Sequence, residues 1–217
     1  MDTKRIISET EKFVKRKLLG EGSGHDWWHI LRVWNLAKQI AKSENVNIFV
    51  VELAALLHDI ADWKFHNGDE SAGTKLAEEW LTSQGVDKRT IKTVKEIIED
   101  VSFMGAGVKK KNRSKEGKVV QDADRLDAMG AIGVARCFAY GGNKNREIYN
   151  PDIKPVLHQT SEKYKKSSSP SINHFYEKLL LLKDLMNTKT AKKMAIKRHE
   201  FMEQYLKEFF SEWKGVT

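Results

Sequence analysis

The stretch LAALLHDIADW, residues 53–63, decides the fold because it joins an apolar helix to two polar side chains. Apolar residues recur through it with helical spacing, which predicts a buried helix over about residues 48–60. His58 and Asp59 stand at the end of this apolar run. An imidazole and a carboxylate are costly there unless they are paired or bind a metal ion. If this His-Asp pair stood alone, we would interpret it as buried side chains that hydrogen-bond to their neighbours. A metal site requires further ligand side chains elsewhere in the sequence.

Two other apolar segments supply matching side chains. His29 lies upstream in HDWWHILRVW, and Asp124 lies downstream in QDADRLDAMG. With His58 and Asp59 they make a set of two imidazoles and two carboxylates, which suits one mixed nitrogen and oxygen metal site with open positions for water and substrate. We therefore predict all four as ligands of one divalent ion. The alternative is two core histidines and two capping or surface aspartates.

The order of these side chains, H…HD…D, resembles that of the HD-domain metal-dependent phosphohydrolases, from His25 to about Trp213. The segments GHDWWHILRV, LLHDIADWKF, EGKVVQDADRLDAMGAIGVAR and FAYGG resemble a branch of small stand-alone bacterial HD hydrolases. Helical spacing along the chain, with no convincing strand pattern, predicts an all-α bundle, and the resemblance implies an HD-domain helical bundle. A length of 217 residues favours one domain, so residues 1–217 are expected to form a single HD domain.

The same resemblance implies roles for individual aspartates. In the family pattern the ligand precedes Arg-Leu, so Asp124 is preferred to Asp122. Asp62 matches an acidic position that assists proton transfer in related phosphohydrolases, and we predict it as the catalytic acid/base. The alternative is an exposed aspartate at a helix end. Related alarmone hydrolases carry a second acid where this chain has Trp63, which disfavours an alarmone substrate.

The number of histidines between Asp59 and Asp124 indicates how many metal ions the site holds. Between Asp59 and Asp124 only His66 occurs, whereas family members with two metals supply further histidines in that interval. This predicts a mononuclear site. Mn²⁺ is favoured for two imidazoles and two carboxylates, with Fe²⁺, Co²⁺, Ni²⁺ and Mg²⁺ as alternatives.

Phosphate chemistry also needs cationic side chains, because charge develops on the non-bridging oxygens. Arg32 is the strongest candidate, since it lies one turn after His29. His174 and Lys178 are four residues apart and are expected to share a helix face. The alternative for each lysine is a solvated surface position. The substrate-binding candidates are Arg32, Lys64, Lys178, Lys183 and Arg198.

A second His-Asp dipeptide, His25-Asp26, lies in a glycine-rich turn. Asp26 is predicted to cap the helix that follows. A contact between His25 and substrate is a weaker interpretation than a plain turn residue.

The hydrophobic pattern predicts further helices along the chain. Gly130 and Gly133 would allow a close helix–helix approach, and Asp87 is a good N-cap. Residues 140–170 lack periodicity and hold all three prolines, which predicts either a mobile lid or a surface excursion. The expected helices span about residues 3–19, 26–43, 48–60, 69–83, 88–101, 118–139, 171–186 and 188–213.

Composition sets the remaining bounds. With 40% hydrophobic and 31% charged residues the chain is typical of globular proteins, and Cys137 alone allows no intramolecular disulfide. The charged N-terminal segment is unlike a secretory signal, and no apolar run approaches the ~18 residues of a membrane span. These features predict a cytoplasmic protein without a membrane partner.

The net charge of +8 fits nucleic-acid binding, steering of an anionic substrate or a plain solvated surface. With the resemblance, it favours a phosphohydrolase acting on nucleotides, most simply converting a (deoxy)nucleoside triphosphate to monophosphate and pyrophosphate. The alternatives are a 5′-deoxynucleotidase acting on monophosphates and a non-catalytic HD scaffold that binds nucleic acid. Oligomeric state is left open.

Overall fold

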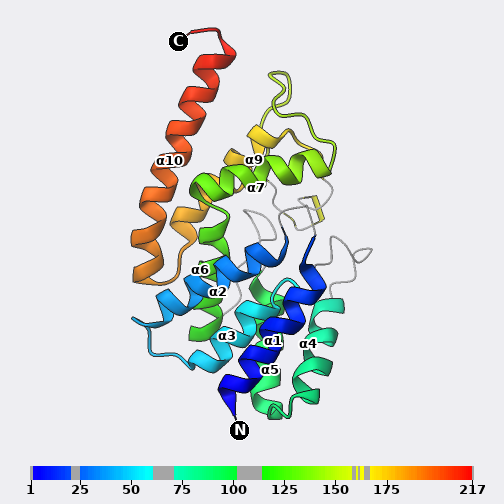
Figure 1. Ribbon diagram of the computed structural model, residues 1–217. Helices are drawn as coiled ribbons and strands as arrows, with labels where there is room; N and C mark the ends of the chain where they lie inside the picture. The colour runs from blue at the N-terminus through cyan, green and yellow to red at the C-terminus, as the bar shows by residue number, and fades with distance from the viewer. Residues whose placement is uncertain are drawn as a thin grey trace. The chain divides into compact units, whose positions relative to one another are not determined.

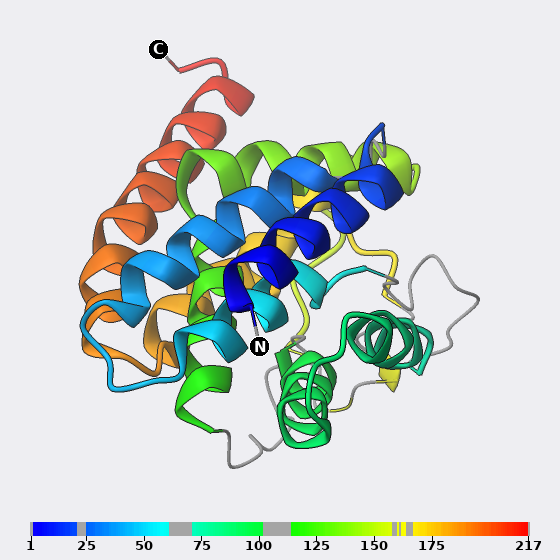
Figure 2. The same cartoon turned by 60° about the horizontal axis from the view of Figure 1, so that its bottom comes forward.

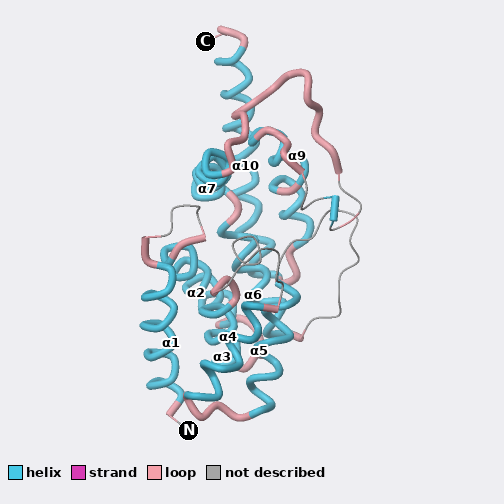
Figure 3. Tube along the Cα trace, turned by 90° about the vertical axis from the view of Figure 1, so that its right-hand side faces the viewer, coloured by secondary structure: helices cyan, strands magenta, loops and turns pink. Residues whose placement is uncertain are grey.

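A computed structural model describes residues 2–20, 25–60, 71–101, 114–157, 160, 162–163 and 167–216. Within these ranges the regular elements are helices, with no strand, which confirms the all-α prediction (Figures 1 and 3). The chain divides into two compact units: described residues up to 101 and from 114 to 124 form the first, and those from 125 onward form the second. That residues 1–217 make a single HD domain stays a prediction.

The first unit is built around one buried helix. α3 packs against α1, α2 and α5, and α4 packs against α5 (Figure 2). Its residues 49–57 are buried except Glu52, so the apolar side chains of LAALL are enclosed on nearly all sides. The helices of this unit are α1 (Thr3–Leu18), α2 (Trp27–Ala41), α3 (Ile48–Leu57), α4 (Ala72–Ser83), α5 (Lys88–Val101) and the first part of α6 (Lys115–Asp127).

Local capping explains where several of these helices begin. Asp26 Oδ1 accepts the backbone N–H of His29 at 2.8 Å, and Asp87 Oδ1 accepts that of Thr90 at 3.0 Å. Both predicted N-caps are confirmed. Asn47 starts α3 in the same way, accepting the N–H of Phe49 at 3.1 Å. Because caps are made by neighbours in sequence, they set the start of α2 independently of distant packing.

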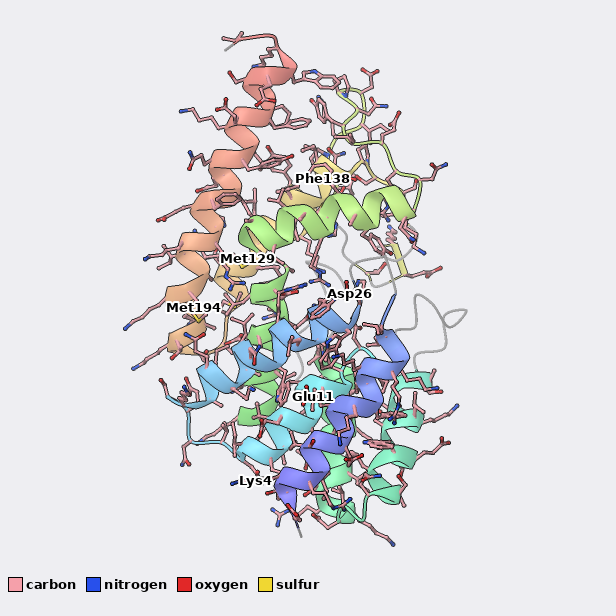
Figure 4. All side chains as sticks on the ribbon, in the orientation of Figure 1. Lys4, Glu11, Asp26, Met129, Phe138 and Met194 are labelled. Carbon is pink, nitrogen blue, oxygen red and sulfur yellow. The ribbon has the colours of Figure 1, made fainter. Side chains whose placement is uncertain are left out.

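The second unit packs α7 (Gly130–Asn143) and a 3₁₀-helix, η2 (Leu179–Leu185), against the long helix α10 (Lys189–Trp213). The short helix α9 (Ser171–Glu177) packs against α7 and η2. Phe138 of α7, labelled in Figure 4, lies 6.2 Å from Phe175 and 6.0 Å from Tyr205 between ring centroids. Aromatic rings from three helices therefore join this core.

The single helix predicted over residues 118–139 is wrong. The structure ends α6 at Asp127 and begins α7 at Gly130, whose φ of +71° lies in the left-handed region that favours glycine. A Cβ atom on Gly130 would lie 3.1 Å from Arg198 Cγ of α10. Gly130 thus turns the chain and lets α10 approach closely, as expected. A Cβ atom on Gly133 would instead meet the backbone carbonyl of Ala128, so Gly133 accommodates the junction of α6 and α7 rather than a neighbouring helix.

The helix predicted over residues 171–186 is also interrupted. α9 ends at Glu177, Lys178 has φ −144° and ψ −59°, and the chain continues as a 3₁₀-helix. Lys178 therefore lies outside the helix that carries His174, and the expectation that both share one helix face is wrong. Sequence spacing alone did not reveal this change of helix type, because apolar residues continue across it.

The segment 140–170 differs from the expected aperiodic stretch at its start, since residues 140–143 belong to α7. Much of its described part is tied to the second unit by hydrogen bonds. Arg146 donates to the carbonyl of Ser167 at 2.7 Å, and Glu177 accepts from Val156 N at 3.1 Å and Ser169 Oγ at 2.8 Å. Its action as a lid stays a prediction.

Candidate metal centre

Five side chains of the first unit meet near the start of α2. Asp26, labelled in Figure 4, marks that start; His25 precedes it, and His29 lies in the first turn of α2. His58 and Asp59 directly follow the last residue of α3, and Asp124 lies on α6. Three helices thus bring together the four residues predicted as ligands, and the turn before α2 adds a fifth side chain.

His29 stands at the middle of this cluster. Its Nε2 atom lies 3.2 Å from His58 Nε2, 3.5 Å from Asp59 Oδ2 and 3.6 Å from Asp124 Oδ1. His58 Nε2 lies 3.8 Å from the same Asp124 oxygen. The side chains of His29 and His58 are 1% and 3% exposed, whereas that of Asp124 is 26% exposed. The cluster is therefore buried on its histidine side and open toward Asp124.

These separations fit ligands that share one ion. A metal–nitrogen distance of about 2.1 Å places neighbouring ligand atoms about 3.0 Å apart at a right angle and about 3.4 Å apart at the tetrahedral angle. Two imidazole nitrogens 3.2 Å apart fall in this range, and the carboxylate oxygens lie slightly outside it. The arrangement can hold a divalent ion without repacking the helices.

The tautomer of His58 supports the same use. Its Nδ1 atom lies 2.9 Å from the backbone carbonyl of Ala55, which can only accept, so Nδ1 carries the hydrogen. In the neutral imidazole, Nε2 then keeps its lone pair and points toward His29. A hydrogen bond of this kind is the usual means of orienting a histidine ligand.

Asp59 is ionised in this environment. In the ion-free protein burial acts to raise its pKa, but the charges that His25 and His58 carry when protonated, with hydrogen bonds from His25 and His29, hold the pKa well below its usual range. A carboxylate that stays charged while largely buried is suited to a cation.

Sequence reasoning missed the part that His25 plays in this cluster. Its Nδ1 lies 2.6 Å from Asp59 Oδ2, and its ring stands edge-on to His29 at 5.7 Å between centroids. Among the described residues, two sets have ligand atoms close enough to hold an ion, His25 with His29 and Asp59, and His29 with His58 and Asp124. The sequence signal for this contact was the spacing of four residues between His25 and His29. The glycines next to His25 in the sequence favoured a plain turn residue instead.

The two aspartates of QDAD are separated by the structure. Asp124 faces the histidines, whereas Asp122 is fully buried and belongs to neither of the two sets found among the described residues. Helical geometry explains this, because residues two apart on a helix point in different directions. The position of the Asp124 side chain therefore supports its choice over Asp122, and its role as a ligand stays a prediction.

The predicted substrate residues of the first part of the chain are only partly described. Arg32 lies on α2 one turn after His29 and is half-buried. The predicted acid/base Asp62, Lys64 and also His66 lie outside the described residues. Their roles stay predictions.

The remaining candidate cations belong to the second unit. Lys178 and Lys183 are partly exposed there, and Lys178 lies near enough to Cys137 to act on its thiol electrostatically. Arg198 donates to the carbonyl of Leu126, and burial lowers its pKa while the charge of Asp127 opposes the shift. Part of its guanidinium is therefore engaged in packing α10 against the end of α6.

Comparison with known proteins identifies the family. The HD domain model matches residues 27–129, a range that includes His29, His58, Asp59 and Asp124. The Bacillus subtilis (strain 168) protein YpgQ is 38% identical over 205 residues, covering 94% of this chain and 92% of YpgQ.

Solved structures of similar proteins match nearly the whole chain. A Lactobacillus plantarum protein is 38% identical with a TM-score of 0.89, over 99% of this chain and 100% of that one. An HD-superfamily hydrolase from Bacillus thuringiensis is 47% identical with a TM-score of 0.73, over 98% of each chain. YpgQ in complex with ADP is 38% identical with a TM-score of 0.75, over 97% of this chain and 100% of that chain.

The matched HD domain and the HD-superfamily hydrolase among the solved structures define the class as metal-dependent hydrolases. The chain belongs to the HD superfamily of metal-dependent phosphohydrolases. This confirms the resemblance and the class of enzyme. Within the described ranges no helix is both long and apolar enough to traverse a bilayer.

Proposed function

We propose that this phosphohydrolase acts on nucleotides, and that its main reaction converts a (deoxy)nucleoside triphosphate to the monophosphate and pyrophosphate. The observation that carries the proposal is the meeting of His29 and His58 at 3.2 Å, with Asp59 and Asp124 beside them. The relative YpgQ has been crystallised with ADP, which supports a nucleotide as the ligand class for this chain.

The four side chains His29, His58, Asp59 and Asp124 would hold one divalent ion, for which Mn²⁺ is the first candidate. Such an ion polarises a phosphoryl oxygen and lowers the pKa of a bound water. Tight packing of both histidines keeps their nitrogens directed at one point. Asp124, the most exposed of the four, would face the incoming substrate.

The other predicted residues complete the chemistry. Asp62 would exchange the proton of the attacking water, since a carboxylate beside the site is a suitable acid/base. Arg32, one turn from His29, would bind a phosphate group, with Lys64 as a second cation. Lys178, Lys183 and Arg198 remain candidates for the same role. We expect the enzyme to be cytoplasmic. Its net charge of +8 would attract a small phosphorylated substrate, which is anionic.

The test is hydrolysis of a nucleotide panel by chelator-treated protein supplied with Mn²⁺. Pyrophosphate released from triphosphates, with the monophosphate as the other product, is the expected result. Phosphate released from deoxynucleoside monophosphates would replace the proposal with a 5′-deoxynucleotidase. Salt-sensitive binding to DNA or RNA that persists without metal, with no turnover, would indicate the non-catalytic scaffold.

Two variants tie any activity to the cluster. His58→Ala and Asp59→Ala should each abolish ion binding and turnover while the circular dichroism spectrum stays helical. Full metal content in Asp59→Ala would remove this site from the proposal.

A further inference from the structure

His25 lies outside the four-residue ligand set, yet it makes a short hydrogen bond to one of the four, Asp59. Its Nδ1 atom is 2.6 Å from Asp59 Oδ2, across 34 positions of sequence. We propose that His25 is a positioning residue, whose hydrogen bond holds the Asp59 carboxylate in the orientation that binds the ion. This rests on the metal site of the proposed function and deepens it.

The direction of the hydrogen bond follows from chemistry. An ionised carboxylate can only accept, so Nδ1 of His25 must carry the hydrogen and donate it. Aspartate side chains are ordinarily ionised near neutral pH, and the separation of 2.6 Å makes the Asp59 oxygen the acceptor. A donor to a carboxylate ligand fixes which oxygen faces the ion and in which plane it lies.

The carboxylate oxygen of Asp59 that accepts from His25 is also the one that lies near His29. Asp59 Oδ2 accepts from His25 and also lies 3.5 Å from Nε2 of His29. Asp59 follows the end of α3, where the chain has already left the helix, so the backbone alone restrains it less than a helical residue. The side chains of His25 and Asp59 are 19% and 11% exposed, so solvent competes only weakly for their hydrogen bond.

His25 and Asp26, the two described residues directly before α2, each contact a predicted ligand. Asp26 accepts the backbone N–H of His29 and sets the start of the helix, while His25 on the same turn reaches Asp59. The ring of His25 also stands edge-on to that of His29 at 73°. The dipeptide His25-Asp26 therefore joins α2 to the end of α3 through side chains.

A different role is open to His25 on geometry alone. Its ligand atom lies close enough to those of His29 and Asp59 for these three to hold an ion themselves. We favour positioning because a donated hydrogen bond of 2.6 Å occupies the nitrogen lone-pair site that an ion would need. An asparagine at position 25 distinguishes the two roles, because its amide can donate a hydrogen bond to Asp59 but cannot replace an imidazole nitrogen as a ligand.

The experiment compares His25→Ala, His25→Asn and wild type, by calorimetric titration of the chelator-stripped proteins with Mn²⁺. Asparagine carries an N–H donor near the place of Nδ1 but no imidazole nitrogen to ligate an ion. His25→Ala should bind Mn²⁺ about 10- to 100-fold more weakly, and His25→Asn should recover most of that loss. All three should bind one ion per chain.

His199→Asn is the matched control, because His199 is also a buried histidine but lies on α10 in the second unit, outside the cluster. It should bind Mn²⁺ as wild type does. The melting temperature of each ion-free variant separates a lost fold from a lost hydrogen bond.

Wild-type affinity in a folded His25→Ala protein would overturn the inference. So would a His25→Asn protein as weak as His25→Ala, or two ions per wild-type chain, because both indicate a direct ligand. A wild-type protein that binds no divalent ion would overturn the proposed function itself, and the inference with it.

Discussion

Replacing His29 by leucine should remove the ion while keeping the helices. His29 Nε2 lies within 3.6 Å of polar atoms of His58, Asp59 and Asp124, so in the proposed site it is the central ligand. Leucine fills similar space in a position with 1% side-chain exposure but offers no lone pair. Losing an outer partner of a ligand costs about 10- to 100-fold in affinity, and loss of this central ligand should cost on the order of 1,000-fold.

Thermal unfolding converts this loss into a measurable shift. An ion at 100 times its dissociation constant stabilises the wild-type fold by about 2.7 kcal/mol. For a chain of this size each kcal/mol raises the melting temperature by roughly 2–4 °C, which gives a rise of about 5–11 °C. The same Mn²⁺ concentration is about 0.1 of the dissociation constant of His29→Leu, and stabilises it by less than ~0.1 kcal/mol. Its melting temperature should therefore not respond.

The assay is differential scanning fluorimetry of chelator-stripped protein over a Mn²⁺ titration. His199→Leu is the matched control, since His199 is also buried but lies on α10 in the second unit, near Glu203. It should keep the full Mn²⁺-dependent rise. A wild-type rise in His29→Leu would refute the assignment of His29 as a shared ligand.

Three further outcomes are expected. Asp62→Asn should keep the Mn²⁺-dependent rise in melting temperature and lose turnover, because the amide cannot exchange a proton; normal turnover would reassign the acid/base. Gly130→Ala should lower the free energy of unfolding in urea by about 1–2 kcal/mol, since Gly130 has φ +71°, whereas Gly142→Ala, with open space at its Cβ, should not. Burial raises the pKa of Cys137 from 9.0 to about 12, so iodoacetamide at pH 8 should modify it far more slowly in native than in urea-unfolded protein; equal rates would contradict this burial.

Much of the helical framework could be predicted from the sequence because the forces that make it are local. Helical spacing of apolar residues identified the buried α3, and Asp26 and Asp87 cap the helices that follow them as expected. The pattern H…HD…D also pointed to side chains that lie close together, although the two possible ion-binding sets among the described residues are His25, His29 and Asp59, and His29, His58 and Asp124. That the four predicted residues bind one ion stays a prediction. Where apolar residues continued through a break, as at Gly130 and Lys178, the pattern predicted one helix too long.

The sequence by itself determined the helix class, the main caps and the chemical types of the proposed ligands, because each depends on residues a few positions apart. Only the tertiary structure decided which atoms meet. The spacing of His29 and His58 nitrogens depends on how α2 crosses α3, which is set by the summed packing of many side chains. The hydrogen bond from His25 to Asp59 joins residues 34 positions apart and has no periodic signal in the sequence, so a histidine predicted as a plain turn residue lies against a predicted ligand.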